Sequence, residues 1–418
     1  MMLSPFRPFL LTVAAVFAVQ PLTVMALENL SFDNVRVEAP DGKGSVLFKH
    51  IDFFDTNLSR DEASKLFASG LSKDEYIAIV SKAQVKRIAI PEITVEPKGD
   101  SSGTITVRSY EVIGLDGGKF QKASIAGFDG TVTSKAGTGT VKSGPIVLED
   151  GDFSKLIIAV KDGDVANGVA RLGKFSWTGF DLQVPDKDTP ASAPGGNLYK
   201  IAMASLNGST TYSGDTPMQS KGEMKGISFE PPKASEAGRT LVKFGYDRVE
   251  AGATLSGNYD AAKKTYSLVD YTITGVNAGA LSFSGSFGNI DKGAFVGSKN
   301  ERLAAIVQGD VSDLTLRFVN QGLFDKAVDF YAASVNRKAA DVKGEWAVAV
   351  TGMLPMMLGG DPAALKMAEA VNTFIRDPKS LTVSLKGKNG PVRFTEAMSL
   401  RDPVTFLSKV QVTTTANQ

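Results

Sequence analysis

The 418-residue sequence lacks cysteine and has a single histidine, His50. Without cysteine, disulfide bonds, thiolate metal sites and cysteine nucleophiles are excluded. With one imidazole, little room is left for histidine chemistry, and any serine–histidine hydrolase would have to use His50. No cluster of His, Asp and Glu has the spacing of a zinc or di-iron site, so we expect neither a metal nor another cofactor.

An excess of charge of one sign is also lacking, because 46 Lys and Arg residues face 45 Asp and Glu residues. Nucleic acids and anionic membrane surfaces select for basic patches, so this balance argues against both as partners. Hydrophobic residues make up 43% of the chain and charged residues 22%. This composition is typical of a globular protein and excludes a largely disordered one.

The first 26 residues predict a cleavable secretory signal peptide. Arg7 is the only charged residue among them, an apolar stretch runs from Phe9 to Val19, and Val24 and Ala26 fit a cleavage site. The stretch is shorter than the roughly 20 residues that a membrane-spanning helix needs, although a retained signal anchor is an alternative. We expect a periplasmic protein without a transmembrane segment after cleavage; secretion from the cell is the alternative.

Strict alternation of apolar and polar residues dominates the rest of the chain. In residues 281–287, Leu281, Phe283 and Phe287 fall on one face of a strand and three serines fall on the other. A period of two predicts strands with one buried and one solvated face, as in antiparallel sheets. The same pattern occurs in segments 104–108, 271–274 and 381–386.

Helix signals interrupt the strand pattern at recognisable places. Ser59 with Glu62, and Ser72 with Glu75, form two capping boxes that predict two short helices over 59–83. Further helices are expected near residues 152–161 and 234–245, and in the C-terminal part over 323–331 and from Asp361 to before Pro378.

The segment 185–196 has three prolines and no apolar periodicity, which predicts a solvated linker loop. It separates an N-terminal β-rich half, 27–184, from a second one, 197–320, and their similar order of elements suggests a loose structural duplication. Residues 321–418 are expected to form a helical cap with a terminal hairpin. The predicted fold class is α+β: a long twisted antiparallel sheet, curled into a groove or split into two related halves, with short covering helices.

Three motif-like segments do not support catalysis. The Gly-x-Ser-x-Gly spacing at 99–103 lies between two predicted strands, whereas a nucleophile elbow joins a strand to a helix. The near P-loop at 168–175 ends in Phe175, where the magnesium-binding hydroxyl is required. The half calcium loop at 162–168 lacks a required oxygen ligand. No catalytic residue is therefore assigned, and a hydrolase that uses His50 is the least favoured alternative.

The phenylalanines of the predicted strands and a group of methionines in the C-terminal part provide the candidate ligand-binding residues. If the sheet curls and the helices cover its apolar face only in part, the interior can hold acyl chains. Methionine adapts to irregular shapes, so a methionine-rich helical patch is a candidate for one end of this interior; the alternative is that it fills a cap packed on the end of the sheet. The expected lining residues are Phe48, Phe128, Phe175, Phe283, Phe287, Met353, Met356 and Met357.

The export signal, the missing cysteines, the long amphipathic strands and the run from 257 to 283 resemble periplasmic β-rich envelope proteins of the AsmA-like type in Gram-negative bacteria. Segments 314–325 and 374–383 are similar to exported alphaproteobacterial envelope proteins. The resemblance implies handling of lipid or assembly of the envelope by surface contact, without bond-making chemistry.

Together these patterns predict a non-enzymatic periplasmic protein that binds a lipid or another hydrophobic ligand, or that supports envelope assembly. The alternative is a structural or interaction module without a ligand, whose Ser/Thr-rich sheet face or sheet edge meets another envelope protein.

Overall fold

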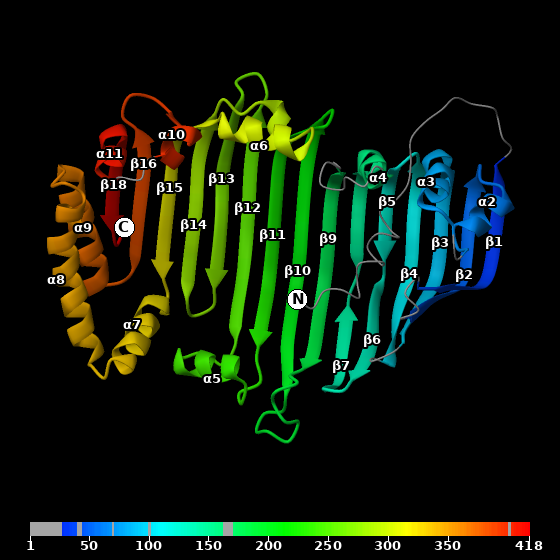
Figure 1. Ribbon diagram of the computed structural model, residues 1–418, viewed down its shortest axis with the longest axis horizontal. Coiled ribbons are helices and arrows are strands. Elements are labelled where there is room, and N and C mark those ends of the chain that lie inside the picture. The colour runs from blue at the N-terminus through cyan, green and yellow to red at the C-terminus, as the bar shows by residue number, and fades with distance from the viewer. Residues whose placement is uncertain (1–26, 40–43, 69–70, 99–101, 162–169, 400–402) are drawn as a thin grey trace. The chain divides into compact units, whose positions relative to one another are not determined.

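Antiparallel strands separated by short helices run through the computed structural model (Figure 1), which describes residues 27–39, 44–68, 71–98, 102–161, 170–399 and 403–418. The predicted α+β class is thereby confirmed. Two compact units are distinguished: unit 1 is Met1–Thr210 with Gly297–Lys299, and unit 2 is Thr211–Val296 with Asn300–Gln418. The predicted signal peptide, 1–26, and the half calcium loop, 162–168, lie outside the described residues.

The described strands of unit 1 form an antiparallel meander. They are β1 (Glu28–Glu38), β2 (Gly44–Thr56), β3 (Gln84–Pro97), β4 (Ser102–Asp116), β5 (Lys119–Ile125), β6 (Gly127–Ser134), β7 (Gly137–Ser143), β8 (Ile146–Asp152), β9 (Arg171–Pro185) and β10 (Leu198–Ser213). β5 and β6 lie end to end along β4, and β7 and β8 lie end to end along β9. Each of these two pairs therefore takes the place of one long strand.

The described helices of unit 1 are α2 (Arg60–Lys65), α3 (Lys73–Lys82) and α4 (Ser154–Lys161). At the start of α2 the Ser59 hydroxyl accepts a hydrogen bond from the Glu62 backbone N–H, and the Glu62 carboxylate accepts one from the Ser59 N–H. Ser72 and Glu75 repeat this arrangement at the start of α3. Both predicted capping boxes are confirmed; each satisfies N–H groups that the first helical turn leaves unpaired.

The core of unit 1 lies between α2 and α3 and one face of β1–β4. Ile51 at its centre is fully buried. Phe67, which follows α2, packs against three rings of the sheet, with ring centroids 5.5 Å from Phe48, 6.2 Å from Phe32 and 6.4 Å from Phe53. Apolar burial of this kind contributes about 25 cal/mol per Å² removed from water. The two capped helices therefore act as the cover of this part of the sheet.

In unit 1 the regular alternation of side chains between the two sheet faces is interrupted at a similar level in more than one strand. Phe48 and Phe53 are five residues apart in β2, so strict alternation would place them on opposite faces, yet both belong to the same core. Asn34 in β1 and Ser109 in β4 adopt left-handed φ values of 54° and 50°. Asn34 and Ser109 each lie between two groups of core residues in their strand. The left-handed conformation there lets the core residues before and after it face the same side of the sheet.

The described strands of unit 2 form a second antiparallel meander. They are β11 (Thr216–Glu230), β12 (Val249–Asp260), β13 (Thr265–Gly275), β14 (Gly279–Gly288), β15 (Asp310–Asn320), β16 (Ser380–Gly387), β17 (Val392–Arg393) and β18 (Val410–Ala416). The pairings run β11–β12–β13–β14–β15–β16–β18, and β17 pairs with the start of β15.

The described helical elements of unit 2 are α5 (Glu236–Lys243), η2 (Lys292–Ala294), α6 (Lys299–Val307, whose first residue is grouped with unit 1), α7 (Leu323–Ser334), α8 (Ala339–Met357), α9 (Pro362–Arg376), α10 (Phe394–Ser399) and α11 (Pro403–Lys409). α4, α5, α7 and α9 confirm the helices predicted beyond the capping boxes. The Asp361 carboxylate accepts a hydrogen bond of 2.8 Å from the Ala363 N–H, and Pro362 occupies the first position of α9. Both roles follow from the usual preferences at helix starts.

Two connections differ in detail from the expected organisation. The segment 185–196 joins β9 to β10 within unit 1, whereas the boundary between the units falls at Thr210 inside β10. Within 321–418, β16 and β18 pair as antiparallel neighbours, but β17, α10 and α11 lie between them along the chain. The final pair is therefore closed by a long connection and is not a tight hairpin.

We predict that Gly127→Ala destabilises unit 1. Gly127 begins β6 with a φ of 138°, and a Cβ there would lie 2.3 Å from the Ser143 carbonyl oxygen. We expect the free energy of unfolding to fall by about 2 kcal/mol or more. Gly196→Ala is the matched control, because Gly196 also has a left-handed φ, 75°, but no atom within 4 Å of the added Cβ. Urea titrations that show equal losses for the two variants would contradict the importance of the close approach.

Candidate functional site

The strand register of unit 2 gathers apolar side chains on one face of the sheet. One row across the strands is Leu255, Tyr271, Phe283 and Leu316, and the next is Ala253, Ile273, Leu281 and Phe318. We call this side the apolar face of unit 2. The intervening positions carry hydroxyls that bond to one another, such as Thr272 to Ser282 at 2.9 Å. The two faces are thus chemically distinct, as the alternation predicts.

Helix α9 covers one part of the apolar face. It packs on β16 and β18, and the ring of its buried residue Phe374 lies edge-on to Phe318 of β15 at 5.9 Å. Phe324 of α7 adds a second edge contact with Phe374 at 5.1 Å. Edge-to-face aromatic pairs of this kind add about 0.5–1.5 kcal/mol to the gain from burial. The covered part of the face therefore behaves as an ordinary core.

Aromatic clusters close the apolar face at both ends of the strands. At the β12–β13 turn, Tyr259 packs on Phe295 with centroids 4.7 Å apart, and its hydroxyl donates to the Ile290 carbonyl at 2.8 Å. At the opposite end, Phe244 after α5 packs on Phe330 of α7 at 5.3 Å. The stretch of sheet between these clusters is therefore bounded along the strand direction.

Between the two clusters the apolar face is open. The side chains of Leu255, Tyr271 and Ile273 remain 40%, 37% and 40% exposed. Figure 1 shows α6 and α5 near opposite ends of β12–β14 and no helix across the middle of these strands. Adjacent large apolar side chains exposed on a regular sheet mark a surface that meets another apolar group. These three residues are the candidate binding surface.

The residues expected to line a ligand site fall in several places. Phe283 lies in the middle of the apolar face of unit 2, and Phe287 stacks on Phe394 within the end cluster at the β12–β13 turn. Met353, Met356 and Met357 lie on the outward side of α8 and are 54%, 74% and 62% exposed. The structure therefore brings the two phenylalanines onto one sheet face and leaves the methionines on a helix surface.

The other three expected lining residues belong to unit 1. Phe48 and Phe128 pack against the core under α2 and α3, and Phe175 lies in β9 opposite Leu148. Sequence reasoning did not single out Leu255, Tyr271 and Ile273 as site residues. Their alternation was visible in the sequence, but which strands the helices leave uncovered is set by distant segments of the chain.

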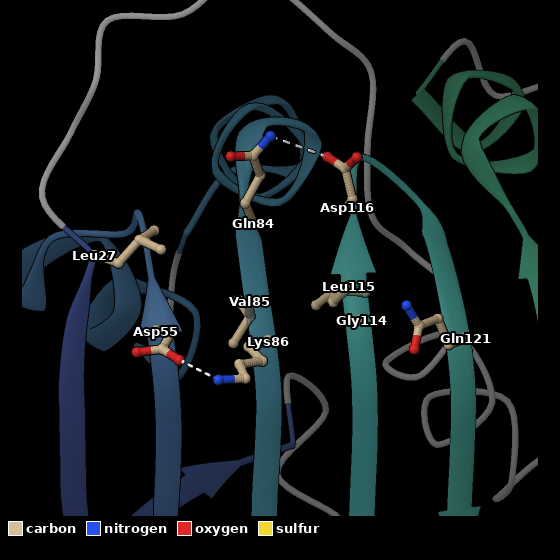
Figure 2. A pocket seen from close by; sticks show the side chains of 9 residues that line it. All are labelled: Leu27, Asp55, Gln84, Val85, Lys86, Gly114, Leu115, Asp116 and Gln121. Carbon is tan, nitrogen blue, oxygen red and sulfur yellow. Dashed lines mark hydrogen bonds and ion pairs between the residues drawn. The ribbon is translucent and has the colours of Figure 1, made fainter.

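A pocket in unit 1 lies between the ends of β2, β3, β4 and β5, as Figure 2 shows. Its lining residues are Leu27, Asp55, Gln84, Val85, Lys86, Gly114, Leu115, Asp116 and Gln121. The Lys86 ammonium pairs with the Asp55 carboxylate at 2.9 Å, and the Gln84 amide donates to Asp116 at 3.2 Å. The polar groups on its wall thus satisfy each other, and the arrangement gives no acid–base or nucleophile pair.

His50 lies between two carboxylates on β1 and β2. Its Nδ1 is 2.6 Å from Asp33 Oδ1, and its Nε2 is 3.0 Å from Asp52 Oδ1. The hydrogen bond to Asp33, together with the charge of Asp52, raises the pKa of His50 above its ordinary value of 6.5. The nearby Ser31 hydroxyl donates to Asp52 at 2.5 Å and not to the imidazole. Both ring nitrogens therefore face carboxylates, which is not the geometry of a serine–histidine pair.

Residues 99–101 of the Gly-x-Ser-x-Gly segment and 168–169 of the near P-loop lie outside the described residues. Ser102 and Gly103 of the first motif belong to β4, which pairs with β3, and residues 171–175 of the second form the start of β9. In the part of the chain that the structure describes, no group of three or more His, Asp or Glu side chains could hold a metal ion. None of the helices described there combines the length and apolarity needed to cross a bilayer.

We predict that the contribution of His50 to stability depends on pH. Because its folded-state pKa is raised, protonated His50 stabilises the fold below about pH 6.5, and this contribution disappears as the pH rises through the folded-state pKa. His50→Gln should therefore lower the urea midpoint at about pH 5.5 and leave it nearly unchanged at about pH 8.5. Asp33→Asn should reduce this pH dependence. A loss of equal size at both pH values would refute the assignment.

Comparison with known proteins gives one family match. A family model described as "Uncharacterized protein" matches residues 272–417, a stretch that begins in β13 and ends after β18. No curated protein matches the chain. The matched stretch contains α7–α9 and the three strands that α9 contacts, β15, β16 and β18.

Proposed function

We propose that this protein is a non-catalytic, exported protein of the cell envelope that holds the acyl part of a lipid on the apolar face of unit 2. The observation that carries the proposal is the exposure of Leu255, Tyr271 and Ile273 on a face whose neighbouring parts are covered. The predicted signal peptide and the absence of cysteine support a periplasmic location.

An acyl chain suits the dimensions and chemistry of the open stretch. The eleven residues of β13 span about 36 Å, and the aromatic clusters at the two ends limit the length available to a ligand. A long, narrow and flexible apolar ligand can lie along the strands between them. Its burial against the three exposed side chains gains about 25 cal/mol for each Å² of apolar surface removed from water.

The alternative function, an interaction module that meets a partner through the Ser/Thr face, has less support. On this face the hydroxyls of Thr315 and Ser384 bond to each other at 3.0 Å, and Thr272 bonds to both Ser282 and Asp270. Hydroxyls that are already paired gain little from a new partner. In the described part of the chain, the exposed side chains of the apolar face form no such hydrogen bonds, so a ligand that covers them gains free energy from their burial.

The test compares two neighbouring residues that point to opposite faces. Ile273→Glu places a charge on the apolar face, and Thr274→Glu places the same charge on the hydroxyl face, where Thr274 is also exposed. We expect Ile273→Glu to weaken binding of a dansyl-labelled fatty acid by about tenfold or more, because a carboxylate would have to be desolvated in the contact. Thr274→Glu should bind as the parent protein does.

Mass spectrometry of protein purified without detergent provides an independent check. We expect co-purifying lipid with the parent protein and with Thr274→Glu, and much less with Ile273→Glu. Parent protein that is repeatedly free of lipid, or equal fatty-acid binding by the two variants, would refute the proposal.

A further inference from the structure

Three segments of unit 2 meet at the end of the strands where α5 and α7 lie (Figure 1). The ring of Phe244, which follows α5, lies 5.3 Å from the ring of Phe330 in α7. The Tyr246 hydroxyl donates a hydrogen bond of 2.9 Å to the Asn277 carbonyl in the turn between β13 and β14. The N–H of Leu323, the first residue of α7, bonds to the same turn at 3.1 Å. These contacts hold the loop after α5, the turn and α7 together.

Large apolar side chains are exposed around these contacts. Val242 in α5 is 49% exposed, Val276 in the β13–β14 turn 54%, and Leu323 and Phe330 in α7 37% each. Leu323 and Phe330 are seven residues apart, so they lie on the same side of α7. We call these four side chains the apolar tip of unit 2. Exposed apolar residues that gather from separate elements mark a surface that meets another apolar group.

The apolar tip lies close to the proposed lipid surface. Val276 follows the end of β13 and comes three residues after Ile273, so the two residues are no more than about 11 Å apart. The Val276 N–H donates to the Glu250 carbonyl of β12 at 2.9 Å, which ties the turn to the neighbouring strand. The proposed lipid surface therefore ends within a short distance of the apolar tip.

An acyl chain resists passage through water. Each methylene group favours apolar surroundings over water by a factor of about four, and these factors multiply along the chain. A protein that holds such a chain therefore exchanges it more readily where its own apolar surface meets a bilayer directly. Exposed apolar side chains at the end of the lipid surface meet this requirement.

Basic side chains without acidic partners lie on the same helices. Arg239 and Lys243 on α5 and Lys326 on α7 have no acidic group within 4.0 Å among the described residues. The Lys326 ammonium lies 3.4 Å from the centre of the Tyr246 ring and donates to the Gly245 carbonyl at 2.7 Å. The positive charge of these groups is therefore available to the phosphate groups of a lipid surface.

The excess of positive charge is small. Glu236 on α5 and Asp329 on α7 also have no ion pair within the described chain. At the opposite end of the strands, by contrast, Lys264 in the β12–β13 turn pairs with Asp291 at 3.0 Å. Because the whole chain has almost no net charge, we expect apolar contact, and not long-range attraction, to supply most of the binding.

We propose that the apolar tip docks on a phospholipid bilayer and that the acyl chain enters or leaves the lipid surface there. Val276, Leu323 and Phe330 would enter the membrane interface, where aliphatic and aromatic side chains are favoured. Arg239 and Lys243 would lie at the level of the phosphate groups, with their apolar stems toward the acyl chains. The route of the acyl chain rests on the proposed lipid function, whereas docking can be measured without it.

Four variants compare the apolar tip with other exposed sites of unit 2. Val276→Glu places a charge in the tip, and Val348→Glu makes the same exchange on α8, where Val348 is 71% exposed. Leu303→Glu places the charge on α6, at the opposite end of the strands, where Leu303 is also exposed. Val242→Glu tests the tip a second time from α5, so the comparison does not depend on the folding of Val276→Glu.

The measurement is co-sedimentation with vesicles of phosphatidylethanolamine that contain about one quarter phosphatidylglycerol. We expect Val276→Glu and Val242→Glu to weaken vesicle binding about tenfold, because a carboxylate would have to leave water. Val348→Glu and Leu303→Glu should bind vesicles as the parent protein does. Transfer of a dansyl-labelled fatty acid from the vesicles to the protein should slow by a similar factor in the two tip variants.

Three outcomes would overturn the docking surface. The first is equal vesicle binding by Val276→Glu, Val242→Glu and Val348→Glu. The second is a loss of binding in Leu303→Glu or Val348→Glu alone, because the contact would then lie elsewhere. The third is a dimer of the parent protein, seen by light scattering, that Val276→Glu converts to a monomer, because the tip would then bind a second copy.

The docking surface and the proposed lipid function fail in different ways. Val276→Glu should still bind dansyl-labelled fatty acid added from solution, and Ile273→Glu should still bind vesicles. Parent protein that takes up fatty acid from solution but does not bind vesicles would refute docking and leave the lipid function standing. Vesicle binding that depends on Val276 in a protein that takes up no fatty acid would support docking and refute the route of the acyl chain.

Discussion

The constraint on which the structure depends is that every strand of a meander has an apolar side that some other group must cover. In unit 1 the cover is local, because α2 and α3 lie between β2 and β3 in the chain and pack on the same strands. In unit 2 the helix that covers β16 and β18 is α9, and none of the described helices crosses the middle of β12–β14. The proposed lipid surface is the part of the apolar side for which the described chain supplies no cover of its own.

The features that could be predicted from the sequence are those fixed by residues close together in the chain. Ser59 with Glu62 and Ser72 with Glu75 define helix starts by direct contact, and alternation such as that of Leu281 and Phe283 defines strands. The shift of core positions between Phe48 and Phe53 could not be predicted, because it depends on left-handed residues in other strands. The exposure of Tyr271 could not be predicted either, since it depends on where α9 packs.

The methionines show how the same residues can support different interpretations. Met353, Met356 and Met357 were expected at the end of an interior channel, and the structure places them on the outer surface of α8. Their side of the helix is apolar and so is the packed side, which carries Val342, Ala347 and Pro355. From Trp346 to Met357 no charged residue occurs on either side of α8, whereas Asp341, Lys343 and Glu345 lie nearer its start.

The order of the strand pairings also affects how the protein folds. Apart from β17, each strand pairs with the strand or the broken strand that precedes or follows it in the meander. Many of these pairs join strands that follow each other closely in the chain, which keeps the entropy cost of loop closure low; β15 and β16, which are separated by α7–α9, are an exception. The first hairpin, β1–β2, needs only 29 residues, Glu28–Thr56, and so can form before later segments are available. The meander can then grow one strand at a time from its N-terminal edge as the chain emerges.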